Sequence, residues 1–251
     1  MPQDRQTIVI ERADQLLGAR SRREFLRAMA IGGSAVLLPG VFAACGDDDD
    51  GMTGVPGVKT ATLDLAGDTG VINYAYALEQ LEAAFYVRVI QESGVAGFNA
   101  IERRLLQDIR NHEFIHREAL RALLGASRLP DLRIDHDFDN TNFRSKGAIL
   151  ERARTFEDLG LSAYNNAARY LATPANLVLF AKIASVEARH SAIVRDLLDD
   201  SSGNAGQLFA GDDIVDENGL DNKGQPTTLT DVLTAARTYI ASTITTINQP
   251  A

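Results

Sequence analysis

Residues 112–124 read HEFIHREALRALL, and residues 186–198 read VEARHSAIVRDLL. Each segment contains Glu-x-x-His, as Glu113 with His116 and as Glu187 with His190, and each has an arginine eight residues after the glutamate. Twelve glutamates and four histidines placed at random over 251 positions would give only about 0.2 pairs at this spacing. The recurrence therefore indicates a duplicated helical segment.

A second repeated pattern precedes each of these segments. Residues 78–86 read LEQLEAAFY and residues 156–164 read FEDLGLSAY, and in both a glutamate is followed seven residues later by a tyrosine: Glu79 with Tyr86, and Glu157 with Tyr164. Apolar residues recur at helical spacing around all four motifs, and turn-forming residues separate them, which predicts helices over about residues 70–93, 99–124, 147–171 and 174–199. The chain reads as a duplicated pair of helices.

The remaining segments complete the expected fold class. Residues 126–146 lack sustained periodicity and predict a long crossover between the second and third helices. Residues 201–226 are rich in Gly and Asp and predict a loop, and about residues 229–247 predict a final helix that packs as a fifth element. We find no strand pattern that competes, so we expect an all-α four-helix bundle with one extra C-terminal helix.

The Glu-x-x-His spacing has a direct chemical consequence. Residues three apart on a helix point to the same face, so each glutamate converges with its histidine, and the flanking apolar residues turn that face inward. Burying several carboxylates side by side is very costly unless they bind protons or cations. Two divalent metal ions would resolve this conflict.

This arrangement strongly resembles the ferritin-like superfamily of di-iron and di-manganese carboxylate proteins, which take a lone glutamate from each of two helices and Glu-x-x-His from each of two others. The resemblance covers about residues 70–200, and within the superfamily the chain is similar to exported bacterial ferritin-like proteins and to desiccation-related proteins. It implies a ferritin-like bundle that binds two Fe or Mn ions, with iron favoured. By this resemblance the bridging ligands would be Glu113 and Glu187, the terminal ligands would be Glu79 and Glu157, and each metal would take one histidine, His116 or His190.

Other residues near these motifs admit two interpretations. Tyr86 and Tyr164 fit core packing better than a hydrogen-bonding or redox role at the metals, and both remain open. Glu82 follows Glu79 by three residues and is a candidate for a mobile ligand or for a hydrogen-bond partner of a ligand, although Gly160 at the matching place in the repeat favours a peripheral role. The two repeated arginines, Arg121 and Arg195, could pair with carboxylates behind the site, although arginines on helix surfaces usually face water. The loop residue His136 is expected at the surface.

A competing motif overlaps the first repeat. Residues 112–116, HEFIH, match the His-Glu-x-x-His pattern of zinc metalloproteases, in which both histidines bind zinc and the glutamate is the general base. Ala119 and Ala122 stand where the extended protease pattern needs glycine and histidine, and Val186 replaces His112 in the second repeat. We therefore keep a zinc protease only as a remote alternative.

The N-terminal region predicts export. Residues 21–27, SRREFLR, resemble a twin-arginine signal, and residues 42–45, FAAC, resemble a lipoprotein box that would lipidate Cys45. We expect residues 1–45 to be this signal, residues 46–57 to be an acidic flexible tether, and residues 58–251 to be the domain. The expected location is the cell envelope, with a lipid anchor as the sole membrane attachment.

Charge and cysteine content narrow the function. The formal net charge is −9, which disfavours nucleic acids as partners and favours cations. One cysteine cannot supply the extra cysteine-rich iron site of a rubrerythrin. We expect redox handling of Fe(II), oxygen or peroxide, of a ferroxidase, peroxidase or catalase type, and the alternative is a non-catalytic metal-binding or stress-protective envelope protein. Whether the chain is an enzyme, and its oligomeric state, stay open at this point.

Overall fold

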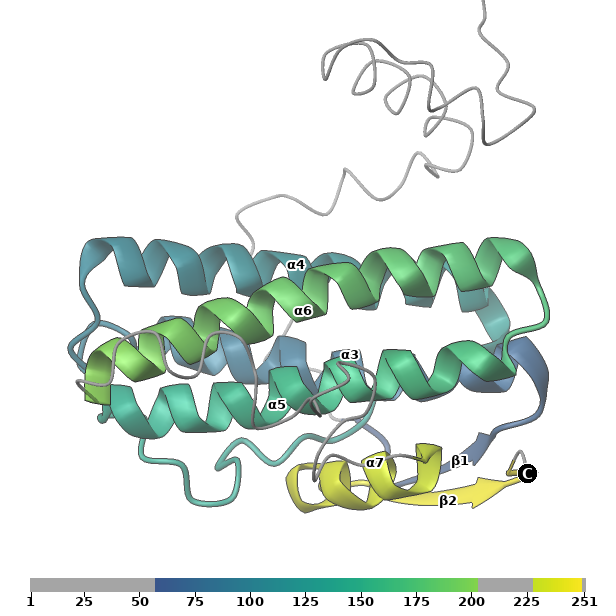
Figure 1. Cartoon of the computed structure of the whole chain (residues 1–251). Coiled ribbons are helices and arrows are strands. Elements are labelled where there is room, and N and C mark those ends of the chain that lie inside the picture. The colour runs from purple at the N-terminus through teal and green to yellow at the C-terminus, as the bar shows by residue number, and fades with distance from the viewer. Residues whose placement is uncertain (1–56, 203–227, 250–251) are drawn as a thin grey trace, which may run out of the picture. The chain divides into compact units, whose positions relative to one another are not determined.

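The computed structural model describes residues 57–202 and 228–249. Four long helices form its centre: α3 (Gly67–Glu92), α4 (Ala100–Leu124), α5 (Lys146–Ala167) and α6 (Pro174–Ser202). Helix α3 packs closely against α4, and α5 packs closely against α6 (Figure 1). The predicted all-α bundle with its duplicated helix pairs is confirmed. The expected signal, the lipid-attachment cysteine and all of the expected tether except its last residue, Gly57, lie outside the described residues.

Local signals in the chain set the ends of these helices. Asn99 and Glu102 form a reciprocal capping box at the start of α4, and Gly125 ends that helix with a φ of +52°, a backbone conformation that glycine adopts without strain. At the start of α6, the Asp68 carboxylate on α3 accepts hydrogen bonds from the amides of Ala172 and Thr173, at 2.7 and 3.0 Å. These bonds lower the pKa of Asp68 to about 2 and tie the two halves of the bundle together.

Helices α3 and α5 are enclosed more completely than α4. Almost every residue in the middle of α3 is buried, whereas α4 buries one stripe and exposes apolar residues such as Ile101 and Ile115. The difference arises because the crossover, α7 (Leu229–Ala236) and a small sheet cover the outer side of α3 and α5 (Figure 1). Within the described residues, no helix is sufficiently long and apolar to cross a membrane.

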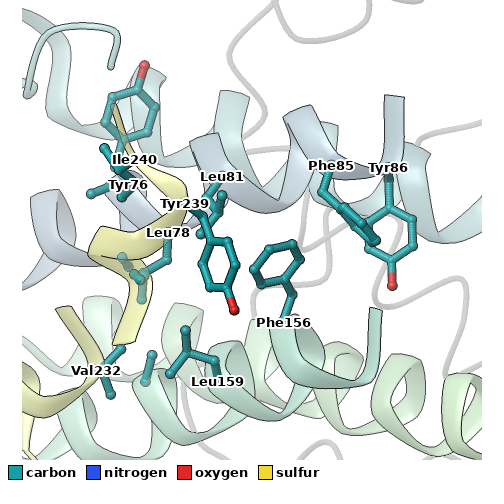
Figure 2. Packing of buried hydrophobic residues seen from close by; sticks show 14 of the residues in the cluster. Tyr76, Leu78, Leu81, Phe85, Tyr86, Phe156, Leu159, Val232, Tyr239 and Ile240 are labelled. Carbon is teal, nitrogen blue, oxygen red and sulfur yellow. The ribbon is translucent and has the colours of Figure 1, made fainter. Parts of the chain in front are cut away.

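The crossover contributes to the core through aromatic residues. Phe138 is fully buried and meets Phe85 of α3 edge to face, with ring centroids 5.3 Å apart. Phe156 of α5 packs edge-on against both Phe85 and Tyr239, at 4.8 and 4.7 Å (Figure 2). Such edge-to-face contacts add about 0.5–1.5 kcal/mol per pair beyond the burial of area. This cluster attaches the outer layer to the two helices that carry the lone glutamates.

The predicted C-terminal helix is correct only for its first part. Helix α7 ends at Ala236, a 3₁₀ turn covers Arg237–Tyr239, and Thr243–Ile247 form strand β2. This strand pairs in parallel with β1 (Thr60–Asp64), in a register that places Thr60 opposite Thr243. The expectation that no strand would form was therefore wrong. The β-branched run TITTI favours extended backbone, and pairing with β1 buries Ile244 to 5% exposure.

Candidate metal centre

The six residues expected as metal ligands come from all four helices of the bundle and meet in its interior. Glu79 lies on α3, Glu157 on α5, and the Glu-x-x-His pairs lie on α4 and α6. All four glutamates are fully buried, and His116 and His190 are 7% and 2% exposed. An exposed set of salt-bridging residues is therefore excluded, and the structure brings every one of the six to the same place.

The six side chains form two overlapping groups that share two glutamates. One group consists of Glu79, Glu113, His116 and Glu187, and the other consists of Glu113, Glu157, Glu187 and His190. Within each group, one ligand atom per residue lies within 4.8 Å of all the others. The shared residues are Glu113 and Glu187, the two that the resemblance implies as bridges between metal ions.

The histidine contacts repeat this two-fold arrangement. Nδ1 of His116 lies 2.9 Å from Oε1 of Glu187 and 3.4 Å from Oε2 of Glu113. Nδ1 of His190 lies 2.6 Å from Oε1 of Glu113 and 3.5 Å from Oε2 of Glu157. Each histidine thus turns the same ring nitrogen toward the carboxylates, and each serves a different group.

Apart from the close approach of the two histidine nitrogens, most of the carboxylate oxygens at the centre receive no hydrogen bond. Both oxygens of Glu113 and of Glu187, and one oxygen each of Glu79 and Glu157, are buried without a hydrogen-bond donor. Native proteins satisfy nearly all buried polar atoms, so a convergent set of unsatisfied oxygens indicates a missing positive partner. Carboxylate and imidazole ligands suit divalent iron, manganese or zinc. The residues present therefore fit bound metal ions.

The raised pKa values of three of the glutamates also indicate that the site lacks positive charge. Burial raises the pKa of Glu79 well above its usual value, and burial together with Glu113 raises the pKa of Glu187. The pKa of Glu157 rises to about 8, chiefly through burial. Without a cation, protons must therefore neutralise part of the cluster.

The pKa values of the two histidines and of Glu113, which contacts both, shift so that the charged form of each is favoured. Burial alone would lower the pKa of His116 and of His190, but the surrounding carboxylates outweigh it and raise both to about 11. Burial would raise the pKa of Glu113, but its contacts with both histidines lower it to about 2. A metal ion that binds here must displace these protons from the imidazoles.

Each lone glutamate accepts a hydrogen bond from a tyrosine on the helix that carries the other lone glutamate. The Tyr86 hydroxyl on α3 donates to Oε1 of Glu157 on α5, and the Tyr164 hydroxyl on α5 donates to Oε1 of Glu79 on α3. Both rings are also fully enclosed in the core, at 0% and 2% exposure, and Figure 2 shows Tyr86 beside Phe85. Core packing and hydrogen bonding are therefore both present at each tyrosine.

Glu82 is a further buried glutamate beside the four glutamates of the two ligand groups. It is 3% exposed, one of its oxygens has no hydrogen-bond donor, and burial together with Glu187 raises its pKa well above the usual value. A Cβ added to Gly160 of α5 would lie 2.5 Å from Oε1 of Glu82 and 3.3 Å from Oε2 of Glu187. The glycine in one repeat therefore makes room for the extra glutamate of the other, and Glu82 lies next to the six residues and not at the periphery.

A buried ion pair lies behind the site, which is one of the two interpretations that the repeated arginines allowed. Arg195 is 1% exposed and donates to both oxygens of Asp158, which also accepts a hydrogen bond from Ser191 at 2.7 Å. Asp158 follows Glu157 and Ser191 follows His190, so this network links the backbones beside two predicted ligands. The equivalent Arg121 is instead partly exposed, and its guanidinium contacts Glu118 at 3.6 Å, so it follows the other interpretation. Adjacency of Asp158 to Glu157 was the available signal.

His112 belongs to neither of the two groups of candidate ligands. Its Nδ1 lies 2.9 Å from Nε2 of His190, on the side of that ring that faces away from the glutamates. In the protease interpretation His112 and His116 would converge on one ion with Glu113 as the base. The geometry goes against that interpretation, because Glu113 lies in both carboxylate groups and His112 lies in neither.

Comparisons with known proteins bear on the bundle as a whole. No curated protein and no solved structure matches the chain. A family model described as a ferritin-like domain matches residues 67–200, which begin with α3 and extend almost to the end of α6. The matched segment contains all six buried glutamates and histidines of the two groups. By its matched segment, which spans more than half of its length, the chain belongs to the ferritin-like domain family.

Proposed function

We propose that the chain is a dinuclear metal carboxylate protein that binds two Fe or Mn ions, with iron favoured, and uses them for redox handling of Fe(II), oxygen or peroxide. The observation that carries this proposal is the pair of overlapping ligand groups that share Glu113 and Glu187, with buried oxygens that lack hydrogen bonds. In the proposed assignment each group holds one ion, and the two shared glutamates bridge them.

Charge balance supports two ions better than one. Burial raises the pKa of Glu82 and favours its neutral form, so the four carboxylates of the two groups carry four negative charges. Two divalent cations neutralise these charges when both imidazoles are neutral ligands. A single divalent ion would leave two buried negative charges to be neutralised by protons. The absence of thiolate from both groups fits iron or manganese, which accept oxygen and nitrogen ligands.

Enclosure of the site limits the reactants. Because the four glutamates are fully buried and the histidines nearly so, the proposed site suits metal ions, oxygen and peroxide better than bulky organic molecules. Iron or manganese bound there would supply redox chemistry toward such small oxidants. The chain itself would orient Glu79 and Glu157 through their tyrosine hydrogen bonds and keep bulk water away from the carboxylates.

The place of action is a proposal from the sequence alone. The twin-arginine-like residues 21–27 and Cys45 support export and lipid attachment at the cell envelope, and they lie outside the described residues. Twin-arginine export transports folded proteins, which would allow metal ions to be inserted before the protein crosses the membrane.

The same enclosure favours one second candidate, a non-catalytic protein whose ions stabilise the bundle. All six ligands are held by helix packing, and each of the two lone glutamates is fixed by a tyrosine, which would keep bound ions locked in place. The two candidates differ in one measurable respect, which is whether the loaded protein consumes oxygen or peroxide.

The test combines elemental analysis with a matched pair of variants. We expect the exported protein to contain about two Fe or Mn ions, and we expect Glu113→Gln to lose both because this residue belongs to both groups. Glu151→Gln on the exposed side of α5 is the control and should retain both. Stoichiometric zinc, or no metal in the unaltered chain, would refute a di-iron or di-manganese centre.

Oxygen and peroxide consumption then separates the two candidates. The loaded protein should take up oxygen during Fe(II) titration or remove peroxide, and Glu113→Gln should abolish this activity. Full metal content without any such consumption would support the structural role instead.

A further inference from the structure

The two proposed metal positions have different surroundings, and His112 is the source of one difference. His112 lies on α4 directly before Glu113, and its Nδ1 is 2.9 Å from Nε2 of His190 on α6. The two rings are nearly parallel, at 12°, and their centroids are 5.1 Å apart. These values fit an in-plane hydrogen bond between two imidazoles. His112 itself is exposed, so packing in the core does not explain its position.

The second repeat lacks this partner. Val186 precedes Glu187 on α6, in the place that His112 occupies before Glu113 on α4. Because a valine side chain has neither a hydrogen-bond donor nor an acceptor, it cannot serve His116 as His112 serves His190. The duplication therefore preserves the six proposed ligands but not the support behind the histidines.

The hydrogen bond assigns roles to the ring nitrogens once a cation is present. Nδ1 of His190 faces Glu113 and Glu157, at 2.6 and 3.5 Å, so this nitrogen must be free of hydrogen to bind a metal ion. Nε2 of His190 then carries the hydrogen and donates it to Nδ1 of His112. A partner that accepts this hydrogen fixes both the tautomer and the orientation of the ligand ring.

We propose that His112 is a positioning residue that orients His190 for metal binding and makes the two positions unequal. The ion held by Glu113, Glu157, Glu187 and His190 is then bound more tightly than the ion held by Glu79, Glu113, Glu187 and His116. This inference rests on the proposed dinuclear site. It assigns to the first histidine of HEFIH a role that is neither direct ligation nor packing.

Co(II) titration of the metal-free full chain tests this assignment. The visible absorption of Co(II) reports the geometry of each ion, and equilibrium dialysis gives the number bound. We expect the unaltered chain to bind two Co(II) ions with unequal affinity. His112→Ala should weaken the tighter ion by about 10–100-fold and shift its absorption bands, while the other ion stays unchanged.

Two further variants distinguish positioning from a general structural effect. His112→Asn keeps an oxygen near the place of Nδ1 that can accept the hydrogen, so it should restore most of the affinity and the original bands. Val186→Ala, at the matching position of the other repeat, should change neither ion. Loss of both ions in His112→Ala, or failure of the asparagine to restore the tighter one, would overturn the positioning role.

The outcomes also separate this inference from the proposed function. If the unaltered chain binds two ions and His112→Ala binds both with unchanged affinity and spectrum, the positioning role is wrong and the dinuclear site stands. If the unaltered chain binds no Co(II), both proposals are overturned.

Discussion

Replacement of Gly160 by alanine tests the contact between the two repeats that the extra glutamate requires. The new methyl group would lie 2.5 Å from Oε1 of Glu82, although a carbon and an oxygen in ordinary contact are more than 3 Å apart. Glu82 is 3% exposed, so its carboxylate has to move within a filled interior. The substitution therefore forces a rearrangement beside the proposed metal ligands.

Two opposing effects set the magnitude. Alanine in the middle of a helix is more stable than glycine by about 0.5–1 kcal/mol. Extra volume in a filled core costs about 1–3 kcal/mol. We expect Gly160→Ala to lower the free energy of unfolding by about 1 kcal/mol net, which corresponds to about 2–4 °C in melting temperature for a domain of this size.

Gly147 on the same helix supplies the control. A Cβ at Gly147 meets no atom within 4 Å, so Gly147→Ala should raise stability by up to about 1 kcal/mol. Thermal unfolding of the metal-free protein, followed by circular dichroism, measures both variants. In a Glu82→Ala background the closest contact is gone and only the 3.3 Å approach to Oε2 of Glu187 remains, so Gly160→Ala should no longer destabilise the protein. This gives a coupling energy of about 1–3 kcal/mol between the two positions.

The result that would refute this reasoning is equally specific. If Gly160→Ala raises the melting temperature as much as Gly147→Ala does, Glu82 does not occupy the space beside the glycine. The same conclusion follows if Glu82→Ala leaves the effect of Gly160→Ala unchanged.

Three further predictions address the site and the small sheet. The metal-free protein should lose thermal stability as pH rises from about 4.5 to about 8. The raised pKa of Glu157 means that the folded state holds a proton that the unfolded state releases, and saturating metal should remove this dependence of stability on pH. Tyr164→Phe should destabilise the metal-free protein by about 1–3 kcal/mol in denaturant titrations, because a buried carboxylate oxygen loses its donor, whereas Tyr74→Phe should change little since that buried hydroxyl has no partner. In the same titrations, Ile244→Ala should lower the free energy of unfolding by about 2–5 kcal/mol and Ile247→Ala by less than about 1 kcal/mol. Equal effects would contradict the strand pairing, which buries Ile244 and leaves Ile247 exposed.

The local pattern of the chain was sufficient to predict the four helices and the residues that meet between them. The two residues of Glu-x-x-His lie within about one turn of a helix, so helical periodicity places both side chains on the same face whatever the helix packs against. The apolar residues around Glu113 and Glu187 identified that face as the buried one, and the structure places both glutamates at 0% exposure. Duplication of the pattern made the prediction stronger than either copy alone.

The C-terminal segment shows where local reasoning failed. Thr243–Ile247 is too short to reveal its partner, and its strand exists because Thr60–Asp64 lies beside it in the folded chain. Pairing between segments so far apart in sequence depends on the bundle that brings them together, and no local propensity contains that information.

Within the site, the sequence by itself determined which side chains gather, and the tertiary structure decided which of them touch. Tyr86 and Glu79 lie seven residues apart, about 10 Å along one helix, so their hydrogen bonds had to be made elsewhere. Packing of α3 against α5 brings Tyr86 to Glu157 and places Glu82 in the space that Gly160 leaves. Packing of α5 against α6 joins Arg195 to Asp158. Helical periodicity is a property of consecutive residues, whereas these contacts depend on the relative position of helices distant in sequence, which only the packed core sets.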